Sequence, residues 1–256
     1  MTEYDITSPS NERIKRLVRL RNRRHRDQEG LFTVEGPRLL ARALESGLQP
    51  IEIFTDGSAG NTSGTESVLV EPSVLDKASY RQSSQGVIAV FEQFHLTLDG
   101  VSLSSPALII ATEAIEKPGN LGAMMRTASA VGGDALITLG AGTDIFNPNV
   151  LRASTGAFFS LPCVQTDMGS MRSWLSANSI SLFAASPEAD RSIWDVDLTG
   201  SSALLIGAED AGLSDAAIEI ADHLVTIPMR SPTVDSLNAS VSLAVFAYEA
   251  LRQRRG

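Results

Sequence analysis

The sequence is poor in the residues that build disulfides and metal sites. It has one cysteine, Cys163, and three histidines that lie far apart along its 256 residues. A single cysteine excludes an intrachain disulfide and a thiolate zinc cluster, and the histidines lack metal-ligand spacing. We therefore expect no metal, and we interpret Cys163, between Pro162 and Val164, as a core residue rather than a nucleophile.

Long apolar runs are also missing. The best one, residues 107–111, is strand-sized and falls far short of the roughly 20 residues that cross a bilayer. The polar segment 1–11 lacks the apolar core of a signal peptide. These absences predict a cytoplasmic protein with no membrane partner. With 43% hydrophobic and 20% charged residues, the chain is expected to form one or two globular domains.

Several common nucleotide-binding and hydrolase motifs are absent. Neither half of the chain has GxGxxG after its first strand, and residues 139–142 match that motif only in part. There is no Walker A loop and no GxSxG. The sequence therefore argues against a Rossmann dinucleotide site and against a Rossmann methyltransferase.

The net charge of −9 is distributed unevenly along the chain. Between positions 11 and 26 there are eight basic residues and one acid, so this window carries +7 and the remainder −16. Such segregation is typical of a phosphate-binding arm on an acidic body, although a solvated basic helix face is the alternative. We predict that the RNA-binding residues are Arg13, Lys15, Arg16, Arg19, Arg23, Arg24 and Arg26.

The first part of the chain alternates helix and strand patterns. We predict a helix over residues 13–24 capped by Ser10, and a second over residues 37–44. Strands are expected at residues 31–35, 51–55, 68–70 and 86–91, with a polar loop at 56–67. Periodicity is lost between 93 and 106. We therefore predict a small α/β domain over residues 1–95, a linker over 96–105 and a second domain over 106–256.

The second domain alternates strands and helices more strongly. Strands are expected at residues 107–112, 135–139, 181–185, 203–207 and 224–227. Helices are expected at residues 121–131, 148–158, 170–177 and at the C-terminus. This alternation predicts a mainly parallel sheet covered on both faces. In the last helix, a single apolar packing stripe is predicted to contain Leu237, Val241, Ala244, Tyr248 and Leu251.

Ligands of parallel α/β sheets bind beyond the carboxyl ends of the strands, so the segments after the strands carry the functional interpretation. In the first segment, Pro118 and Gly119 are expected to form a turn and Asn120 to cap the following helix. Arg126 follows among small residues, which would let a ligand approach closely. An ordinary capped helix with a surface arginine is the alternative.

Two later segments place polar residues at similar positions. Glu209 follows a buried strand and lies between Gly207 and Gly212. Ser236 precedes the last helix, where it would serve as a cap, and Asn238 adds a second polar group there. Each of these segments alone is a weak indication of a site.

Together the segments resemble the SpoU (TrmH) family of the SPOUT superfamily, which are RNA ribose 2′-O-methyltransferases. The first motif is matched by Asn120, Gly122 and Arg126, and residues 147–157 resemble the family's Arg-Ala-Ser-x-Gly helix. The other two motifs are matched by Gly207, Glu209, Gly212 and Leu213, and by residues 227–229 and 236–238. Residues 10–15 and 32–38 resemble the substrate-binding domain that precedes many members. The chain departs from the family at Ala208, where Asn is common, and in the loop 230–235, which lacks glycine.

The resemblance implies a trefoil-knotted catalytic domain, S-adenosylmethionine as cofactor and a homodimer. It places cofactor contacts at Gly207, Ile227, Met229 and Leu237. It makes Arg126 the central catalytic residue, with the RNA and Arg126 oriented by Asn120, Glu209, Ser236 and Asn238. The added first domain favours ribosomal RNA as substrate. Transfer RNA is the alternative substrate, and a non-catalytic RNA-binding protein that keeps the fold is the alternative function.

Overall fold

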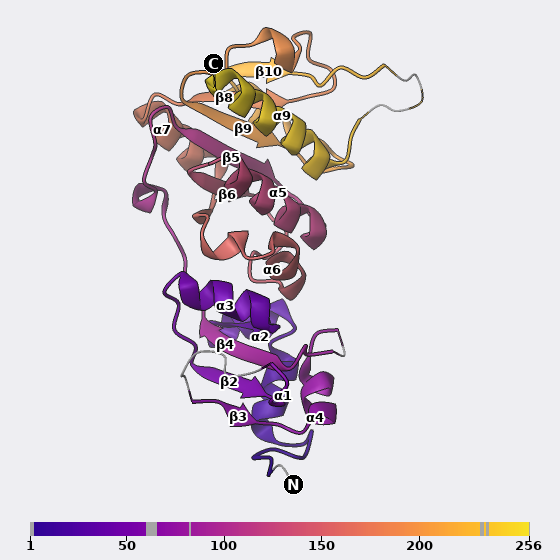
Figure 1. Ribbon diagram of the computed structural model, residues 1–256. Helices are drawn as coiled ribbons and strands as arrows, with labels where there is room; N and C mark the ends of the chain where they lie inside the picture. The colour runs from indigo at the N-terminus through magenta and orange to yellow at the C-terminus, as the bar shows by residue number, and fades with distance from the viewer. Residues whose placement is uncertain (1–2, 60–65, 82, 231–232, 234–235, 256) are drawn as a thin grey trace. The chain divides into compact units, whose positions relative to one another are not determined.

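The computed structural model describes residues 3–59, 66–81, 83–230, 233 and 236–255. Its residue contacts form two compact units (Figure 1): Met1–Phe94 with Asp144–Phe159, and His95–Thr143 with Ser160–Gly256. Parts of the predicted loops 56–67 and 230–235 lie outside the described residues. By its contacts, Asp144–Phe159 belongs to the N-terminal unit. A single domain boundary in the sequence cannot describe this division. The domain limits 1–95 and 106–256 stay a prediction.

The N-terminal unit contains a four-stranded sheet with the order β1-β4-β2-β3. The pairs β1/β4 and β2/β4 are antiparallel, and β2/β3 is parallel. Its strands are β1 Leu31–Glu35, β2 Glu52–Thr55, β3 Val68–Leu69 and β4 Val87–Glu92. Its helices are α1 Glu12–Arg19, α2 Arg23–Glu29, α3 Pro37–Glu45, α4 Pro72–Ala78 and α6 Pro148–Ser154, followed by the 3₁₀ turn η2 Ala157–Phe159. The strands confirm the predicted ones to within about two residues at each end, whereas α4 was not predicted.

The single helix predicted over residues 13–24 is wrong. The chain instead forms α1 and α2, because Asn22 accepts a hydrogen bond from the backbone N–H of Arg24 at 2.9 Å and starts a second helix. Asn11, and not Ser10, caps α1 through the N–H of Arg13. Ile14, Leu17 and Leu20 are buried on this segment, so the basic window is part of the core rather than a free arm.

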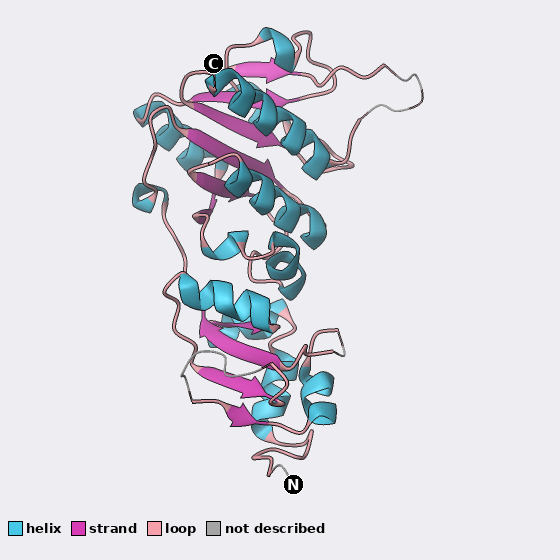
Figure 2. Cartoon of the chain, in the orientation of Figure 1, coloured by secondary structure: helices cyan, strands magenta, loops and turns pink. Residues whose placement is uncertain are grey.

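The C-terminal unit contains a six-stranded sheet in which every pair is parallel, with the order β10-β8-β9-β5-β6-β7 (Figure 2). Its strands are β5 Leu108–Glu113, β6 Ala135–Leu139, β7 Cys163–Thr166, β8 Ser181–Ala185, β9 Ser202–Ile206 and β10 His223–Val225. The longer helices are α5 Pro118–Ala130, α7 Met168–Ala177, α8 Asp215–Ile220 and α9 Ala239–Arg254. Short 3₁₀ turns lie at η1 Leu98–Gly100 and η3 Ile193–Asp195. The parallel sheet is confirmed, and β7 is an addition to the prediction.

Helices cover both faces of this sheet. Met171 and Leu175 of α7 and Ala217 of α8 share one apolar core with β5, β6, β8 and β9, whereas α5 and α9 pack against each other (Figure 1). Cys163 is buried on β7, and burial raises the pKa of its thiol to about 12, so it has no thiolate to act as a nucleophile. No helix among the described residues is both long and apolar enough to span a bilayer.

The packing stripe predicted for α9 is wrong. Val241 is 46% exposed and Tyr248 is 52% exposed. The helix instead buries a neighbouring stripe formed by Leu243, Phe246, Ala247 and Ala250. Both faces of α9 are apolar, so periodicity alone could not decide which of them packs on α5 and β9.

Candidate active site

A cavity lies in the C-terminal unit where the strands β8, β9 and β10 end and α9 begins. It encloses about 650 Å³, counting its solvent-open mouth. Its walls come from the segments 185–187, 206–209, 225–229 and 236–242. All the residues predicted to contact a cofactor line it: Gly207, Ile227, Met229 and Leu237. Glu209 and Ser236, which were predicted as catalytic, line it as well.

The loop after β9 is held in a tight turn. Ala208 and Gly212 exchange two backbone hydrogen bonds, both of 3.0 Å. This closure brings the chain back against Gly207, where a Cβ atom would lie 2.3 Å from the carbonyl carbon of Gly212. Only glycine fits there, because the clashing atoms are backbone rather than a flexible side chain. Gly207 therefore sets the shape of the cavity wall.

We predict that Gly207→Ala weakens binding of S-adenosylmethionine, the cofactor that the family resemblance implies, by at least about tenfold, because the loop 208–212 must shift into the cavity or away from it. Isothermal titration calorimetry with the full chain measures this. Gly200→Ala is the matched control, because a Cβ atom at Gly200 meets nothing within 4 Å. Equal affinities of the Gly207→Ala variant and the wild type would contradict the prediction.

Three side chains from distant parts of the sequence meet at the carboxylate of Glu209. This group accepts hydrogen bonds from the side chains of Lys117, Asn120 and Asn238. Lys117 and Asn120 come from the start of α5, whereas Asn238 comes from the start of α9. The structure thus joins three of the residues predicted as catalytic: Asn120, Glu209 and Asn238.

The amide of Asn238 is oriented by its role as helix cap. Its Oδ1 accepts from the backbone N–H of Ser240 at 3.0 Å and from the Ser240 hydroxyl at 2.7 Å. The Nδ2 group therefore faces Glu209 and lies 3.3 Å from Oδ1 of Asn120. An aspartate at position 238 would instead place a second carboxylate against Glu209, which would be repulsive.

The surroundings of Glu209 favour its ionised form. The hydrogen bond from Lys117 lowers the pKa of Glu209 below its ordinary value of 4.5, in spite of partial desolvation, and the bond from Asn120 acts in the same direction. The same contact raises the pKa of Lys117. An acid with a lowered pKa is a poor proton acceptor near neutrality. The arrangement favours an orienting role for Glu209, one that is lost only when the pH falls below about 4.5.

Two positions differ from the sequence interpretation of this segment. Asn120 is not the cap of α5, because the helix begins at Pro118 with Lys117 as its N-cap, and Asn120 lies in the first turn. The polar role of Lys117 was not predicted. Its position before the Pro-Gly pair was the only available indication, since its partner Glu209 is 92 residues away.

Arg126 and Ser236 stand apart from the Glu209 network. Arg126 is exposed on α5 and makes no hydrogen bond or ion pair with the described residues. Ser236 is exposed at the cavity rim, and Asn238 rather than Ser236 caps α9. Both side chains are therefore open to a ligand.

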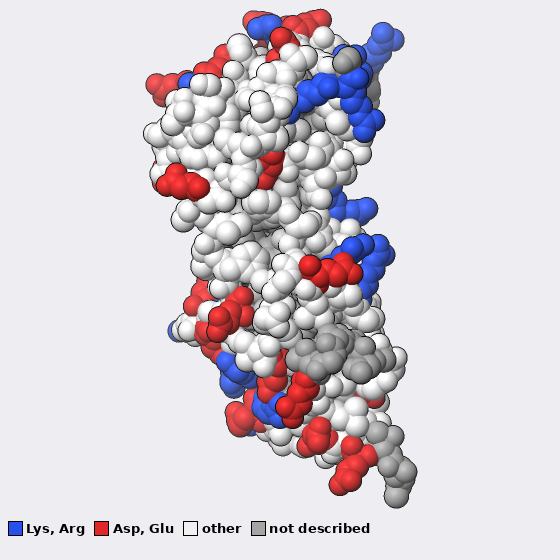
Figure 3. Space-filling model, turned by 60° about the vertical axis from the view of Figure 1, so that its left-hand side comes forward, with Lys and Arg blue, Asp and Glu red and all other residues white. Residues whose placement is uncertain are grey.

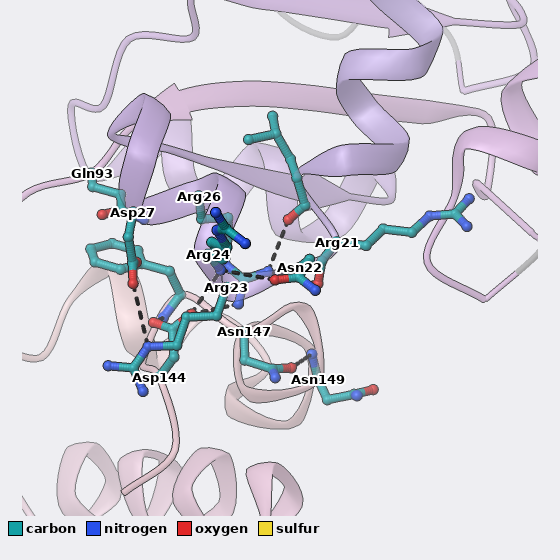
Figure 4. A network of polar contacts seen from close by, with 12 residues as sticks. Arg21, Asn22, Arg23, Arg24, Arg26, Asp27, Gln93, Asp144, Asn147 and Asn149 are labelled. Carbon is teal, nitrogen blue, oxygen red and sulfur yellow. Dashed lines mark hydrogen bonds and ion pairs between the residues drawn. The ribbon is translucent and has the colours of Figure 1, made fainter. Parts of the chain in front are cut away.

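In the predicted RNA-binding set, Arg26 is a correction. It is 1% exposed and binds Asp144 through two nitrogens at 3.1 and 2.5 Å (Figure 4). Its third nitrogen donates to the carbonyls of Leu20 and Arg21, both at 2.8 Å. Arg26 is therefore a buried structural residue that phosphate cannot reach.

The other basic residues of the window are exposed or half-buried, and most have acidic partners. Arg16 binds Glu29 at 2.6 Å, and Arg23 binds Asp27 at 3.5 Å. The remaining pairs are Arg13 with Glu52, and Lys15 and Arg19 with Glu12. Acidic and basic side chains accordingly lie next to one another on the part of this unit that Figure 3 shows. Two of the partners, Asp27 and Glu29, come just after the window, so the charge count of +7 overstates the local field. Arg24 alone of this set makes no ion pair within the described residues.

Comparison with known proteins shows the family. Residues 107–248 match the SpoU rRNA Methylase family, and residues 11–89 match the MRM3-like substrate binding domain. The chain therefore belongs to the SpoU rRNA methylase family, which confirms the resemblance read from its three motifs.

Relatives of known name are similar over nearly their whole lengths. The 23S rRNA (uridine(2479)-2′-O)-methyltransferase of Streptomyces viridochromogenes is 33% identical, with 92% of this chain and 87% of the relative aligned. The 23S rRNA (guanosine(2553)-2′-O)-methyltransferase RlmP of Bacillus subtilis is 28% identical over 95% of this chain and 97% of its own. The crystal structure of AviRb from Streptomyces viridochromogenes in complex with AdoMet has a TM-score of 0.89 and 32% identity, and it covers 96% of this chain and 98% of its own.

Proposed function

We propose that this chain transfers a methyl group from S-adenosylmethionine to a ribose 2′-hydroxyl of ribosomal RNA. The observation that carries the proposal is the meeting of Asn120, Glu209 and Asn238 beside the cavity after β9 and β10. The named relatives methylate 23S rRNA at the 2′-oxygen, and the structure of AviRb contains AdoMet.

The cavity residues fit an adenosyl group. The walls combine apolar side chains of Ile206, Ile227 and Leu237 with backbone polar groups. Ile227 and Met229 are half-buried, and their backbone groups make no hydrogen bond with the described residues. Backbone N–H and C=O groups in a concave wall can form hydrogen bonds with a bound ligand. We assign the cofactor contacts to Gly207, Ile227, Met229 and Leu237.

The chemistry assigns different tasks to the polar residues. When bound, the sulfonium supplies an activated methyl group, so the protein has mainly to position the ribose and stabilise the oxygen that loses its proton. Arg126 carries a planar guanidinium group, which matches the geometry of phosphate oxygens. It therefore binds the phosphate next to the ribose and lowers the pKa of the 2′-hydroxyl. Asn120, Glu209, Ser236 and Asn238 orient the ribose and Arg126.

The domain roles follow from the same family. Residues 1–95 form the substrate RNA-binding domain, 96–105 the linker and 106–256 the catalytic domain. The match of residues 11–89 to a substrate-binding domain supports the first assignment. The loops after β9 and β10 form the trefoil knot, a proposal supported by their meeting in one cavity.

The experiment that tests the function compares 2′-O-methyl groups in total RNA from cells with and without this protein. Purified protein and radiolabelled S-adenosylmethionine are then supplied with the unmodified RNA. We expect one ribose methylation in 23S rRNA that depends on the protein. A methyl group found only in transfer RNA supports the alternative substrate. Cofactor or RNA binding without transfer supports a non-catalytic protein.

The exposed lysine and arginine side chains of α1 and α2 are expected to add RNA affinity without affecting the rate of methyl transfer. Deleting them would remove Ile14, Leu17 and Leu20 from the core, so point substitutions are the better test. For Lys15→Gln combined with Arg24→Gln, the log-log salt slope of RNA binding should become shallower by roughly 1.4 to 1.8. Arg191→Gln with Arg255→Gln, which removes two charges from the other unit, is the control. Equal salt slopes of RNA binding in both double variants would mean that this helix face contacts water and not RNA.

We further propose that the chain forms a homodimer through α9. Val241 and Tyr248 expose a large part of their apolar surface there, 46% and 52%. Tyr248→Glu should convert a dimer into a monomer in sedimentation velocity, because a buried unpaired carboxylate opposes association. Trp194→Glu, which alters another exposed apolar residue, should leave the dimer intact. A Tyr248→Glu variant that stays dimeric would place the interface elsewhere.

A further inference from the structure

A second cavity lies within the N-terminal unit, between β1, the start of α3, the turn that precedes β4, and α6. It encloses about 1090 Å³, counting its solvent-open mouth. Its charged lining consists of three arginines and one carboxylate: Arg38, Arg81, Arg152 and Glu35. None of these residues belongs to the basic window. Arg38 and Arg152 lie in the segments 32–38 and 147–157 that resemble the family, but no contact with RNA was assigned to them individually.

The protein offsets only part of the positive charge of this cavity, because three arginines share the lining with one carboxylate. Among the described residues, no acid lies within ion-pair distance of Arg38, Arg81 or Arg152. Arg152 donates only to the amide oxygen of Asn149. Desolvation is the largest effect that lowers the pKa of Arg152, and repulsion from Arg81 is the second. The two guanidinium groups therefore repel each other.

The one carboxylate of the lining accepts hydrogen bonds from the protein. Glu35 accepts from the Ser79 hydroxyl at 2.9 Å and from the backbone N–H of Tyr80 at 2.8 Å. Burial raises the pKa of Glu35, although its hydrogen bonds and the charges of Arg21 and Arg152 act in the opposite direction. Glu35 therefore fixes the turn at residues 79–80 rather than pairing with an arginine.

The rim of the cavity is held in shape by contacts on both sides. Asn149 of α6 donates to the hydroxyl of Tyr80 at 3.1 Å. Gly36 has a positive φ of 89°, and a Cβ atom there would lie 2.5 Å from Oε1 of Gln85. A cavity with a fixed rim and only partly neutralised arginines is preorganised for an anion, because guanidinium groups bind phosphate oxygens in pairs.

We propose that this cavity binds one unpaired nucleotide of the substrate RNA, with its phosphate held by Arg38, Arg81 and Arg152. The inference rests on the proposed function, which makes RNA the substrate. The site is concave, so it admits a nucleotide turned out of a loop and not the side of a duplex. Recognition of single-stranded loops and bulges through such splayed nucleotides is common in RNA-binding proteins.

The test uses the full chain with two exposed arginines replaced, Arg38→Gln with Arg81→Gln. Its ligand is 23S rRNA from cells that lack the protein. We expect RNA affinity to fall about tenfold at moderate salt and the salt slope to become shallower by roughly 1.4. The Arg191→Gln, Arg255→Gln double variant should change neither quantity. S-adenosylmethionine affinity and the rate of transfer at saturating RNA should stay near those of the wild type.

Two further measurements separate the possible results. RNA carrying 4-thiouridine should crosslink to peptides from residues 33–39 or 148–155 in the wild type and not in the double variant. A single-stranded oligonucleotide should compete for binding better than a duplex of the same sequence. Unchanged affinity and salt slope in the variant, or equal competition by the duplex, would overturn the inference. If the wild type methylates no RNA, the proposed function fails whatever these binding results are.

Discussion

Arg126→Ala is expected to slow methyl transfer by about 10²- to 10³-fold while the affinity for S-adenosylmethionine changes less than about twofold. Arg126 is exposed on α5, among the small residues Gly122, Ser129 and Ala130, so RNA can approach it closely. It makes no hydrogen bond or ion pair within the described part of the chain that its loss would break. The effect should therefore fall on the chemistry and not on folding.

Single-turnover kinetics at saturating RNA measure this effect, and calorimetry measures cofactor binding. Arg126→Lys is the informative companion, because lysine keeps the charge but loses the planar pair of donors, so an intermediate rate is expected. Arg255→Ala, an exposed arginine at the end of α9, controls for net charge. Near-normal turnover of Arg126→Ala would refute a catalytic role.

Asp144→Ala is expected to lower the free energy of unfolding of the N-terminal unit by about 3–5 kcal/mol. Asp144 is the acidic partner of Arg26, and the two side chains are 8% and 1% exposed. Without Asp144 the guanidinium of Arg26 stays buried with only the carbonyls of Leu20 and Arg21 as acceptors. An uncompensated buried charge is among the most destabilising changes in a protein.

Urea denaturation followed by hydrogen exchange at α1 and α2 measures this loss, because a chain of two units need not unfold in one step. Asp27→Ala is the matched control, because Asp27 pairs with Arg23 on the surface and its loss should cost less than about 1 kcal/mol. Arg26→Met added to Asp144→Ala should restore much of the stability by removing the unpaired charge. A loss below about 1 kcal/mol in Asp144→Ala would show that the pair is not required.

The segments that meet at the candidate site follow largely from the sequence. Asn120, Glu209 and Asn238 each follow a strand of a parallel sheet, and the carboxyl ends of such strands meet at one edge. The family resemblance, and not this rule, implied cofactor contacts at Gly207, Ile227, Met229 and Leu237, and these four residues line one cavity. Lys117 could not be predicted as a site residue, because its role depends on Glu209, 92 residues away in the sequence.

The sequence by itself determined most of the strands, the parallel sheet and the family, because periodicity, turn residues and motif spacing are local properties of the chain. Only the tertiary structure decided which apolar stripe of α9 is buried and which arginines face solvent. Arg26 and Arg24 look alike in the sequence, yet one is buried against Asp144, 118 residues further on, and the other is exposed. Burial and charge pairing depend on residues brought together from distant segments, so no local pattern can specify them.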